Sequence, residues 1–423
     1  MRSLAERLEQ QQRSHPSSID LTLDRVREVA RRLDLLAPDH RVITVGGTNG
    51  KGSTVACVDA MARAAGLRCG RFTSPHLVRY NERICVDGVE ADDASLIASF
   101  ERIDAARADI TLTFFEYNAL AALDHFRHSR VDVAVLEVGL GGRFDATNIL
   151  DADVAVVCSI GIDHVDWLGH TLEAIGREKA GIFRRGRPAV LGTAHMPDSV
   201  WAAIQEVGAE PVVPGTDFRS SVSVRDVTTW DFVYGTFALR GLPLPALAGI
   251  HQMSNAATAL AALKALGGVE LTQANVSYAL RNVRLPGRFQ RVPGEVEWIL
   301  DVAHNVPAAL GLVENLRALP RARTIGVCGI LGDKDLQGIT AALADSVDAW
   351  VLVLLDGPRA VSTQDLARQL PAGAHVLAHA TDVASGCRLA REAARPGDRI
   401  LVFGSFLTVG PALEFLGPEF VRL

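Results

Sequence analysis

Several features that mark other classes of protein are missing from this chain of 423 residues. No apolar run approaches the ~20 residues that a membrane span requires. The first residues, MRSLAERLEQQQRSH, lack the apolar core of a secretory signal peptide. Positive charge is not in excess either, because the formal net charge is −6 and the pI is about 6.1. Nucleic-acid-binding domains usually show a basic stripe and a pI above about 9, so we expect neither nucleic acid nor a membrane as a partner.

Cysteine pairs are absent as well. The six cysteines form no C-x-x-C pair, and most stand in apolar stretches such as VAVVCSI and TIGVCGI. This pattern is typical of reduced, buried thiols and predicts a cytoplasmic protein. Hydrophobic residues make up 48% of the chain and charged residues 22%, which excludes a predominantly disordered chain. At ~100–200 residues per domain, the length predicts two or three domains.

Lysine is scarce. Of the 43 basic residues only four are lysines, namely Lys51, Lys179, Lys264 and Lys334. Arginine is the default cation here, so a lysine in its place can indicate a need for a compact ammonium group or a modifiable amine. Chance is a sufficient explanation for Lys264, which stands in an Ala/Leu-rich helical stretch. Periodicity alone also favours a solvated Lys179 on a helix face, paired with Glu178 or Glu173.

Short β-rich runs alternate with helical stretches along the chain, which predicts βαβ units and a mostly parallel sheet. The segment 211–249 is rich in Val, Thr and aromatic residues and predicts a small antiparallel β patch. Two prolines in 285–293 predict a linker. We therefore expect an α/β protein with a P-loop ATPase-like domain over 1–284 and a smaller, Rossmann-like α/β domain over 294–423.

The sequence VGGTNGKGST, which begins at Val45, joins a predicted strand to a predicted helix. Glycines let the backbone approach a phosphate, and the helix N-terminus adds the positive end of its dipole. Lys51 can reach the terminal phosphates, and a hydroxyl from Ser53 or Thr54 can ligate Mg²⁺. The strict Walker pattern fails, because Val45 replaces its first glycine and Gly52 follows Lys51. No G-x-G-x-x-G is present, so we predict a nucleoside triphosphate site rather than a dinucleotide site.

Acidic residues and a histidine follow two other predicted strands. Glu137 ends the apolar run VDVAVLE, and Asp163, His164 and Asp166 follow the run VAVVCSI. In open α/β sheets, ligands bind outside the carboxyl ends of the strands. A carboxylate beside a phosphate loop suits a Mg²⁺ ligand or a residue that positions water. His164, flanked by acids, is expected to contact metal or substrate.

The second half of the chain holds further polar clusters. Asn255, in the first turn of a predicted helix, either hydrogen-bonds a base or ribose or simply caps the helix. Arg288 stands in the predicted linker and could clamp a phosphate. Asp301, His304 and Asn305 end the first strand of the C-terminal domain, which predicts a second ligand-binding edge.

These motifs together resemble the folylpolyglutamate synthase family of the Mur ligase superfamily, and in particular its members that are also dihydrofolate synthases. The resemblance covers nearly the whole chain and rests, in order, on GTNGKGS, TSPHLVRYNERI, TFFEYNALAAL, LEVGLGGRFDATN, SIGIDHVDWLG, REKAGIF, NAATALAAL, LPGRFQ, DVAHN and GSFLTVG. It implies a ligase that uses ATP to add L-glutamate to dihydropteroate, giving dihydrofolate, and to reduced folates, giving folylpolyglutamates, through an acyl phosphate.

Two rivals fit less well. Cell-wall Mur ligases carry a further N-terminal substrate domain, and we expect too few residues for one before Gly47. A regulatory P-loop NTPase would leave the second α/β domain, with Asp301 and His304, unexplained.

The resemblance also implies that the protein is a monomer, and it implies a role for each matched residue. The ATP-binding residues would be Thr48, Asn49, Gly50, Lys51, Gly52, Ser53, Asn255, Arg288 and Asp301. The ligands of Mg²⁺, bound as two ions, would be Ser74, Glu137, His164 and a carbamylated Lys179, with either Ser53 or Ser74 supplying the hydroxyl. The pterin- or folate-binding residues would be Ile19, Asp20, Leu21, Thr113, Phe114, Phe115, Glu116, Phe144, Asp145 and Ala146. Lys51, Lys179 and His304 would be catalytic.

Overall fold

The computed structural model describes residues 3–17, 19–223 and 226–420. These form two compact units. The N-terminal unit consists of the chain up to His76 together with Tyr80–Ala246 and Met253–Val283. The C-terminal unit consists of Arg284 onward together with two short segments from earlier in the chain, Leu77–Arg79 and Leu247–Gln252. Neither unit is therefore one continuous stretch of sequence.

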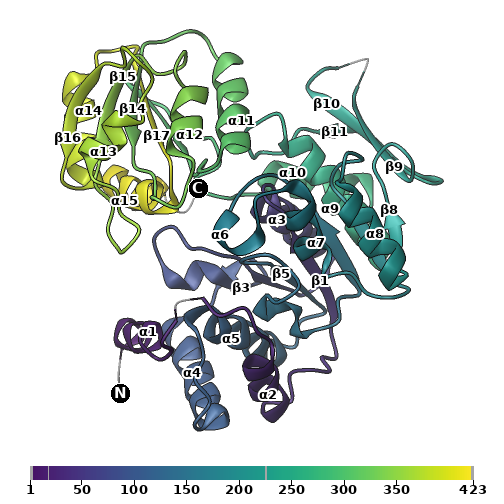
Figure 1. The fold of residues 1–423 in the computed structure, drawn as a ribbon. Coiled ribbons are helices and arrows are strands. Elements are labelled where there is room, and N and C mark those ends of the chain that lie inside the picture. Colours follow the sequence, from purple (N-terminus) through teal and green to yellow (C-terminus); the bar gives the residue numbers. More distant parts are fainter. Residues whose placement is uncertain (1–2, 18, 224–225, 421–423) are drawn as a thin grey trace. The chain divides into compact units, whose positions relative to one another are not determined.

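An eight-stranded sheet forms the centre of the N-terminal unit (Figure 1). Strands β2, β5, β1, β6, β7 and β8 pair in parallel with their neighbours in this order. Strands β3 and β4 add two antiparallel pairs at one edge. This confirms the predicted α/β fold with a mostly parallel sheet. The strand order is β4 (Val89–Glu90), β3 (Ile84–Val86), β2 (Cys69–Phe72), β5 (Val133–Glu137), β1 (Arg41–Gly46), β6 (Val154–Val157), β7 (Pro188–Leu191) and β8 (Glu210–Val212).

Helices cover both faces of this sheet, and its central strands are therefore buried on both faces. On one face, alternate strand residues such as Leu136 and Val157 join a core cluster with α5 (Phe114–Ser129) and α8 (Asp198–Val207). Helix α3 (Lys51–Ala64) packs along β1, β2 and β5. The other helices of this unit are α1 (Leu4–Gln12), α2 (Asp24–Arg32), α4 (Asp93–Arg107), α6 (Val165–Leu168), α7 (Leu172–Ala180), α9 (Gln252–Leu266, which begins at the boundary of the two units) and α10 (Gln273–Asn282), with 3-10 turns η1 (Tyr80–Arg83) and η2 (Ala146–Ile149).

The predicted antiparallel patch is present but shorter than expected. It consists of β9 (Phe218–Val222), β10 (Thr229–Tyr234) and β11 (Phe237–Pro243) in the order β11-β10-β9. Residues 211 and 212 belong instead to β8, which pairs in parallel with β7 on the main sheet. The prediction was wrong there because a three-residue strand carries too little sequence pattern to reveal its partner.

The C-terminal unit contains a six-stranded sheet. Its order is β12 (Gln290–Val292), β13 (Glu297–Asp301), β17 (Arg399–Phe403), β14 (Thr324–Cys328), β15 (Ala349–Val353) and β16 (Val376–Ala380), with only β12 antiparallel to its neighbour. Its helices are α11 (Val306–Arg317), α12 (Leu336–Ala342), α13 (Thr363–Arg368), α14 (Val383–Ala393) and α15 (Phe406–Leu416), followed by η3 (Pro418–Phe420).

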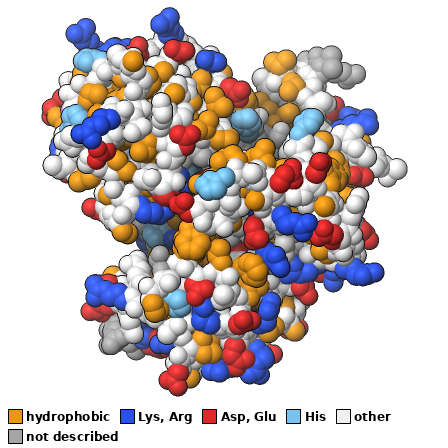
Figure 2. All heavy atoms as spheres, viewed as in Figure 1, with side chains coloured by type: hydrophobic (Ala, Val, Ile, Leu, Met, Phe, Trp, Pro, Cys, Tyr) orange, Lys and Arg blue, Asp and Glu red, His pale blue; other side chains and the backbone are white. Residues whose placement is uncertain are grey.

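The segment expected to be a linker, 285–293, thus contains a strand of this sheet. Val292 lies in the core and Arg291 pairs with Glu297 of β13, so packing and charge fix β12 despite the flanking prolines. Among the described residues, no helix is long and apolar enough to cross a membrane. Acidic and basic side chains are interspersed over the face of the molecule drawn in Figure 2.

Candidate active site

The loop between β1 and α3 has a backbone that only glycine accommodates easily. Gly47 and Gly50 have φ angles of +138° and +88°, values that side chains of L-residues rarely adopt. Gly50 caps α3 at its N-terminus. A Cβ atom on Gly50 would lie 2.8 Å from Oδ1 of Asn255, so a side chain there would displace Asn255. Asn255, from α9, thus lies directly beside the phosphate loop.

The segment after β6 holds the phosphate loop in place. The Thr48 amide donates to the Ser159 carbonyl (2.7 Å) and its Oγ1 accepts from the Gly161 amide (3.0 Å). The Asn49 amide donates to Oγ of Ser159 (3.1 Å). Because these contacts tie the loop to a neighbouring strand end, its geometry is set before any phosphate binds.

Two lysines converge on one carbonyl of this loop. Nζ of Lys51 donates to the Gly47 and Thr48 carbonyls (2.9 and 3.1 Å), and Nζ of Lys179 donates to the Gly47 carbonyl (3.0 Å). Lys179 is only 5% exposed. Burial, followed by repulsion from Lys51, lowers the pKa of Lys179 to about 7. The interpretation of Lys179 as a solvated surface lysine is therefore wrong.

The reason is the packing at the end of α7. Gly142 lies so close that a Cβ there would be 2.8 Å from the Lys179 carbonyl oxygen, and the Arg143 amide donates to the Glu178 carbonyl (2.9 Å). The glycine-rich loop after β5 therefore covers this helix end, which helical periodicity does not reveal.

Glu137 ends β5 directly beside the phosphate loop, because it pairs with Val45 in the sheet register. Its side chain is buried, and its Oε2 accepts from the Ser74 amide (3.2 Å). His164 lies after β6, where its amide donates to Oδ1 of Asp163 (2.8 Å). Among the described residues, no three His, Cys, Asp or Glu side chains are grouped as metal ligands. An ion here would therefore need other oxygen donors, such as a hydroxyl, a modified lysine or a nucleotide phosphate.

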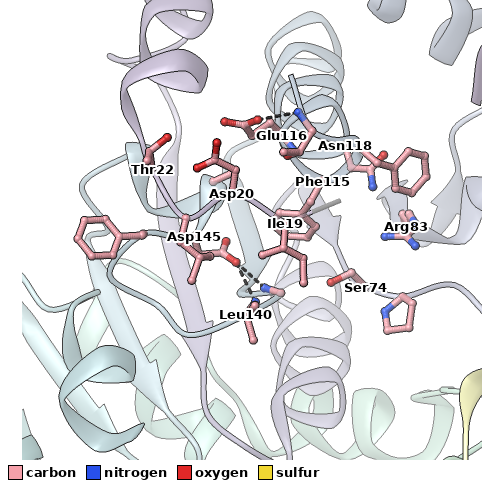
Figure 3. A pocket seen from close by; sticks show the side chains of 17 residues that line it. Ile19, Asp20, Thr22, Ser74, Arg83, Phe115, Glu116, Asn118, Leu140 and Asp145 are labelled. Atoms are coloured by element: carbon pink, nitrogen blue, oxygen red, sulfur yellow. Dashed lines mark hydrogen bonds between the residues drawn. The ribbon is translucent and has the colours of Figure 1, made fainter. Parts of the chain in front are cut away.

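A pocket of about 270 Å³ lies in the N-terminal unit (Figure 3). Four segments far apart in the sequence line it, and they include all the residues to which the resemblance gives a pterin-binding role. These residues are Ile19, Asp20, Leu21, Thr113, Phe114, Phe115, Glu116, Phe144, Asp145 and Ala146. Ser74 also lines this pocket. The tertiary structure thus brings together residues that the sequence separates by more than a hundred positions.

The three acidic residues of the pocket differ in their partners. Oδ2 of Asp145 accepts from the Gly139 and Leu140 amides (2.9 and 3.0 Å), and its Oδ1 accepts from the amide and hydroxyl of Thr147. Burial raises the pKa of Asp145, and these donors oppose the rise. Its carboxylate accepts four hydrogen bonds within its own loop, so it shapes the pocket wall.

Asp20 and Glu116 share one cation. Arg25 donates to Oδ2 of Asp20 (2.8 Å) and to Oε1 of Glu116 (3.2 Å). Glu116 is buried and also forms a capping box with Thr113, which fixes the start of α5. Asp20 keeps 30% of its side chain exposed and is therefore more accessible to a ligand than Glu116.

In the C-terminal unit, Arg288, Asp301 and His304 meet at the carboxyl ends of β13 and β17. Asp301 is level with Phe403 in the sheet register, and its Oδ2 accepts from the Phe289 amide (2.8 Å). The Arg288 guanidinium lies 5.1 Å from the centre of the Phe406 ring, and the His304 ring lies 6.2 Å from it. Burial raises the pKa of Asp301, and Arg288 opposes the rise.

Not every residue of the N-terminal pocket stands out in the sequence. Arg83 and Asn118 line it as well. They stand in the motifs TSPHLVRYNERI and TFFEYNALAAL, but neither spacing nor local pattern distinguishes them from neighbouring residues. Only their position in space identifies them.

The two units correspond to the two parts of a ligase of the Mur type. Residues 45–263 match the model of the Mur ligase middle domain, and residues 287–406 match that of the Mur ligase, glutamate ligase domain. Within that class, the chain belongs to the dihydrofolate synthase/folylpolyglutamate synthase family. It is 45% identical to the dihydrofolate synthase/folylpolyglutamate synthase of Escherichia coli, over 95% of this chain and 93% of the relative. It is 35% identical to the one of Mycobacterium tuberculosis, over 96% of this chain and 92% of the relative.

Solved structures agree with this assignment. E. coli FolC in complex with DHPP and ADP has a TM-score of 0.92 at 44% identity, covering 98% of each chain. A bifunctional folylpolyglutamate synthase/dihydrofolate synthase with Mn, AMPPNP and L-glutamate bound has a TM-score of 0.90 at 42% identity, again covering 98% of each chain.

Proposed function

We propose that this protein is an ATP-dependent ligase that adds L-glutamate to dihydropteroate and to reduced folates. The observation that carries the proposal is the pocket lined by Asp20, Glu116 and Ser74, because Ser74 also contacts Glu137 beside the phosphate loop. A pterin held in this pocket would thus be next to an ATP site. Relatives that share at least 35% of the sequence over nearly the whole chain carry the names of both activities.

The chemistry requires activation, because a carboxylate does not condense with an amine unaided. The substrate carboxylate attacks the γ-phosphorus of ATP, giving an acyl phosphate and ADP. The glutamate amino group then attacks the acyl carbon and expels inorganic phosphate, and a proton leaves the nitrogen as the amide forms. Lys51 and the amides of the phosphate loop would neutralise charge on the transferring phosphoryl group. We assign Arg288 and Asp301 to ATP, and His304 to the transferred phosphate.

The donor set fits a divalent cation. Ser74, Glu137 and His164 offer oxygen and nitrogen ligands, and a carbamate on Lys179 would add an anionic oxygen. We propose that two Mg²⁺ ions bind here. When bound, they would neutralise part of the negative charge of the ATP phosphates. Lys179 would form the carbamate when its neutral amine adds CO₂ and releases a proton.

The direct test offers two glutamate-accepting substrates, dihydropteroate and a reduced folate, to one preparation of the protein. Purified protein with ATP, Mg²⁺ and glutamate is expected to ligate glutamate to dihydropteroate and, in a separate reaction, to a reduced folate. Products are measured by mass spectrometry and ADP by a coupled assay. ADP release without either pteridine would indicate a regulatory NTPase, and activity on reduced folates alone would refute the dihydrofolate synthase activity.

Asp20 offers a test of the pterin-binding assignment. The substitution Asp20→Asn is expected to raise KM for dihydropteroate about 10-fold and leave kcat within about twofold, since a hydrogen bond to a charged group contributes about 1.5–3 kcal/mol. Asp34→Asn is the matched control, because Asp34 pairs with Arg127 (2.9 Å) and lines no part of the pocket. Equal KM values for the two variants in steady-state assays would remove Asp20 from the site.

A further inference from the structure

Arg83 is a buried cation that faces the pocket. It ends η1, is 7% exposed and lines the pocket beside Ser74 (Figure 3). Its Nε donates to Nδ1 of His76 (2.7 Å), and its guanidinium lies 5.8 and 5.5 Å from the ring centres of Tyr80 and Phe114. These contacts fix the orientation of the side chain, and the carboxylates of Glu82 and Glu137 act on its charge only from beyond ion-pair distance.

The contrast with Arg25 is informative. Arg25 lies between two carboxylates of the same pocket. Within the described residues, Arg83 forms no ion pair with a carboxylate within 4 Å, and the one hydrogen bond of its side chain is to an imidazole. A buried charge without a carboxylate in direct contact is only partly compensated. A group that enters the pocket with a negative charge would relieve this cost.

Asn118 gives a second, independent indication. It is fully buried and lines the pocket, and its Oδ1 accepts from the Tyr80 hydroxyl (2.7 Å). Its Nδ2 has no acceptor among the described residues. Buried donors are nearly always paired, so this one also calls for an acceptor from a ligand. Tyr80 touches both Arg83 and Asn118 and thereby links the two side chains at the same wall.

The polar groups of the pocket are divided between its two ends. In Figure 3, Asp20 lies at one end, and Arg83, Asn118 and Ser74 lie toward the other. A dihydropteroate molecule is divided in the same way: its pteridine ring carries N–H donors, and its benzoate end carries a carboxylate. Acceptors therefore match one end of this substrate and donors match the other.

We infer that Arg83 and Asn118 bind the carboxylate of dihydropteroate and so fix the direction in which this substrate enters the pocket. The inference rests on the proposed function. Neither residue performs a chemical step. They hold the carboxylate at the end of the pocket formed by Ser74, the residue whose amide contacts Glu137 next to the phosphate loop.

The test separates charge recognition from a role in shaping the pocket. Binding of dihydropteroate and of its neutral carboxamide is measured by calorimetry for the wild type, Arg83→Met and Asn118→Asp. Arg83→Met is expected to weaken dihydropteroate binding about 10- to 100-fold, the range for hydrogen bonds to charged groups. Binding of the carboxamide should change less than about threefold. Asn118→Asp should show the same split, because it places a negative charge against the carboxylate.

Arg107→Met is the matched control. Arg107 also lies over an aromatic ring, that of Tyr117, but it pairs with Asp104 and does not line the pocket. An equal loss for both ligands in the Arg83 variant, or no loss, would overturn the inference. If Arg83→Met does not fold, Arg83→Lys and Asn118→Asp decide, since the first should retain partial selectivity for the carboxylate and the second should lose it. Failure of the wild type to bind dihydropteroate would instead refute the proposed function.

Discussion

Replacing Lys179 with alanine is expected to lower the rate of glutamate ligation at least about 100-fold, the scale for losing one direct electrostatic contact to a reacting centre. Lys179 is buried beside Lys51 at the carbonyl of Gly47. As a carbamate it would present an oxygen ligand to Mg²⁺, whereas a second ammonium group would repel the metal. Small carboxylic acids that fill the vacant position are expected to restore part of the activity, measured as ADP release that depends on dihydropteroate.

The variant Lys179→Arg sharpens this test. Arginine keeps the positive charge but does not lose a proton to react with CO₂, so it should be as inactive as alanine. Lys264→Ala is the control, because its ammonium lies over the Phe237 ring (4.4 Å) and away from the loop. Normal activity in Lys179→Arg would refute the carbamate, as would a bare amine in a well-resolved structure prepared with bicarbonate.

Replacing Lys51 with methionine is expected to lower kcat about 100- to 1,000-fold, the range for removing one preorganised donor. Nζ of Lys51 is held by two carbonyls of the phosphate loop. Phosphate oxygens are stronger acceptors, because charge-assisted hydrogen bonds are about twice as strong as neutral ones. Methionine keeps the length and apolar character of the side chain, so the effect should come from the charge.

The measurement pairs single-turnover formation of the acyl phosphate with calorimetric binding of ADP. In Lys51→Met, the acyl phosphate should form more slowly and ADP should bind more weakly. The affinity for dihydropteroate should stay within about twofold of the wild type. Unchanged melting temperatures would exclude unfolding as the cause. A variant that forms the acyl phosphate at the wild-type rate would remove Lys51 from phosphoryl transfer.

Not all of the fold was predictable from local patterns. The helices α1, α2, α6, α8 and α13 and the strands β3, β4, β7 and β16 were not among the predicted elements. Strand β16 is half-exposed, and β3, β4 and β7 are two to four residues long, so their periodicity is too weak to distinguish them from loops. Strand β12 was obscured by the prolines around it, because its pairing with β13 depends on contacts that lie outside the local sequence.

The sequence by itself determined the order of most strands and helices, the phosphate loop at Lys51 and the family, since these depend on residue types at short, fixed spacings. Only the tertiary structure decided that Lys179 is buried, because a helix face does not record what packs against it. It also decided that Arg83 and Asn118 share a pocket with Asp20 and Glu116. Four distant segments form that pocket. Two of them follow β2 and β5, whose parallel register sets their carboxyl ends side by side. The other two, before α2 and at the start of α5, are placed by helix packing, which no single segment encodes.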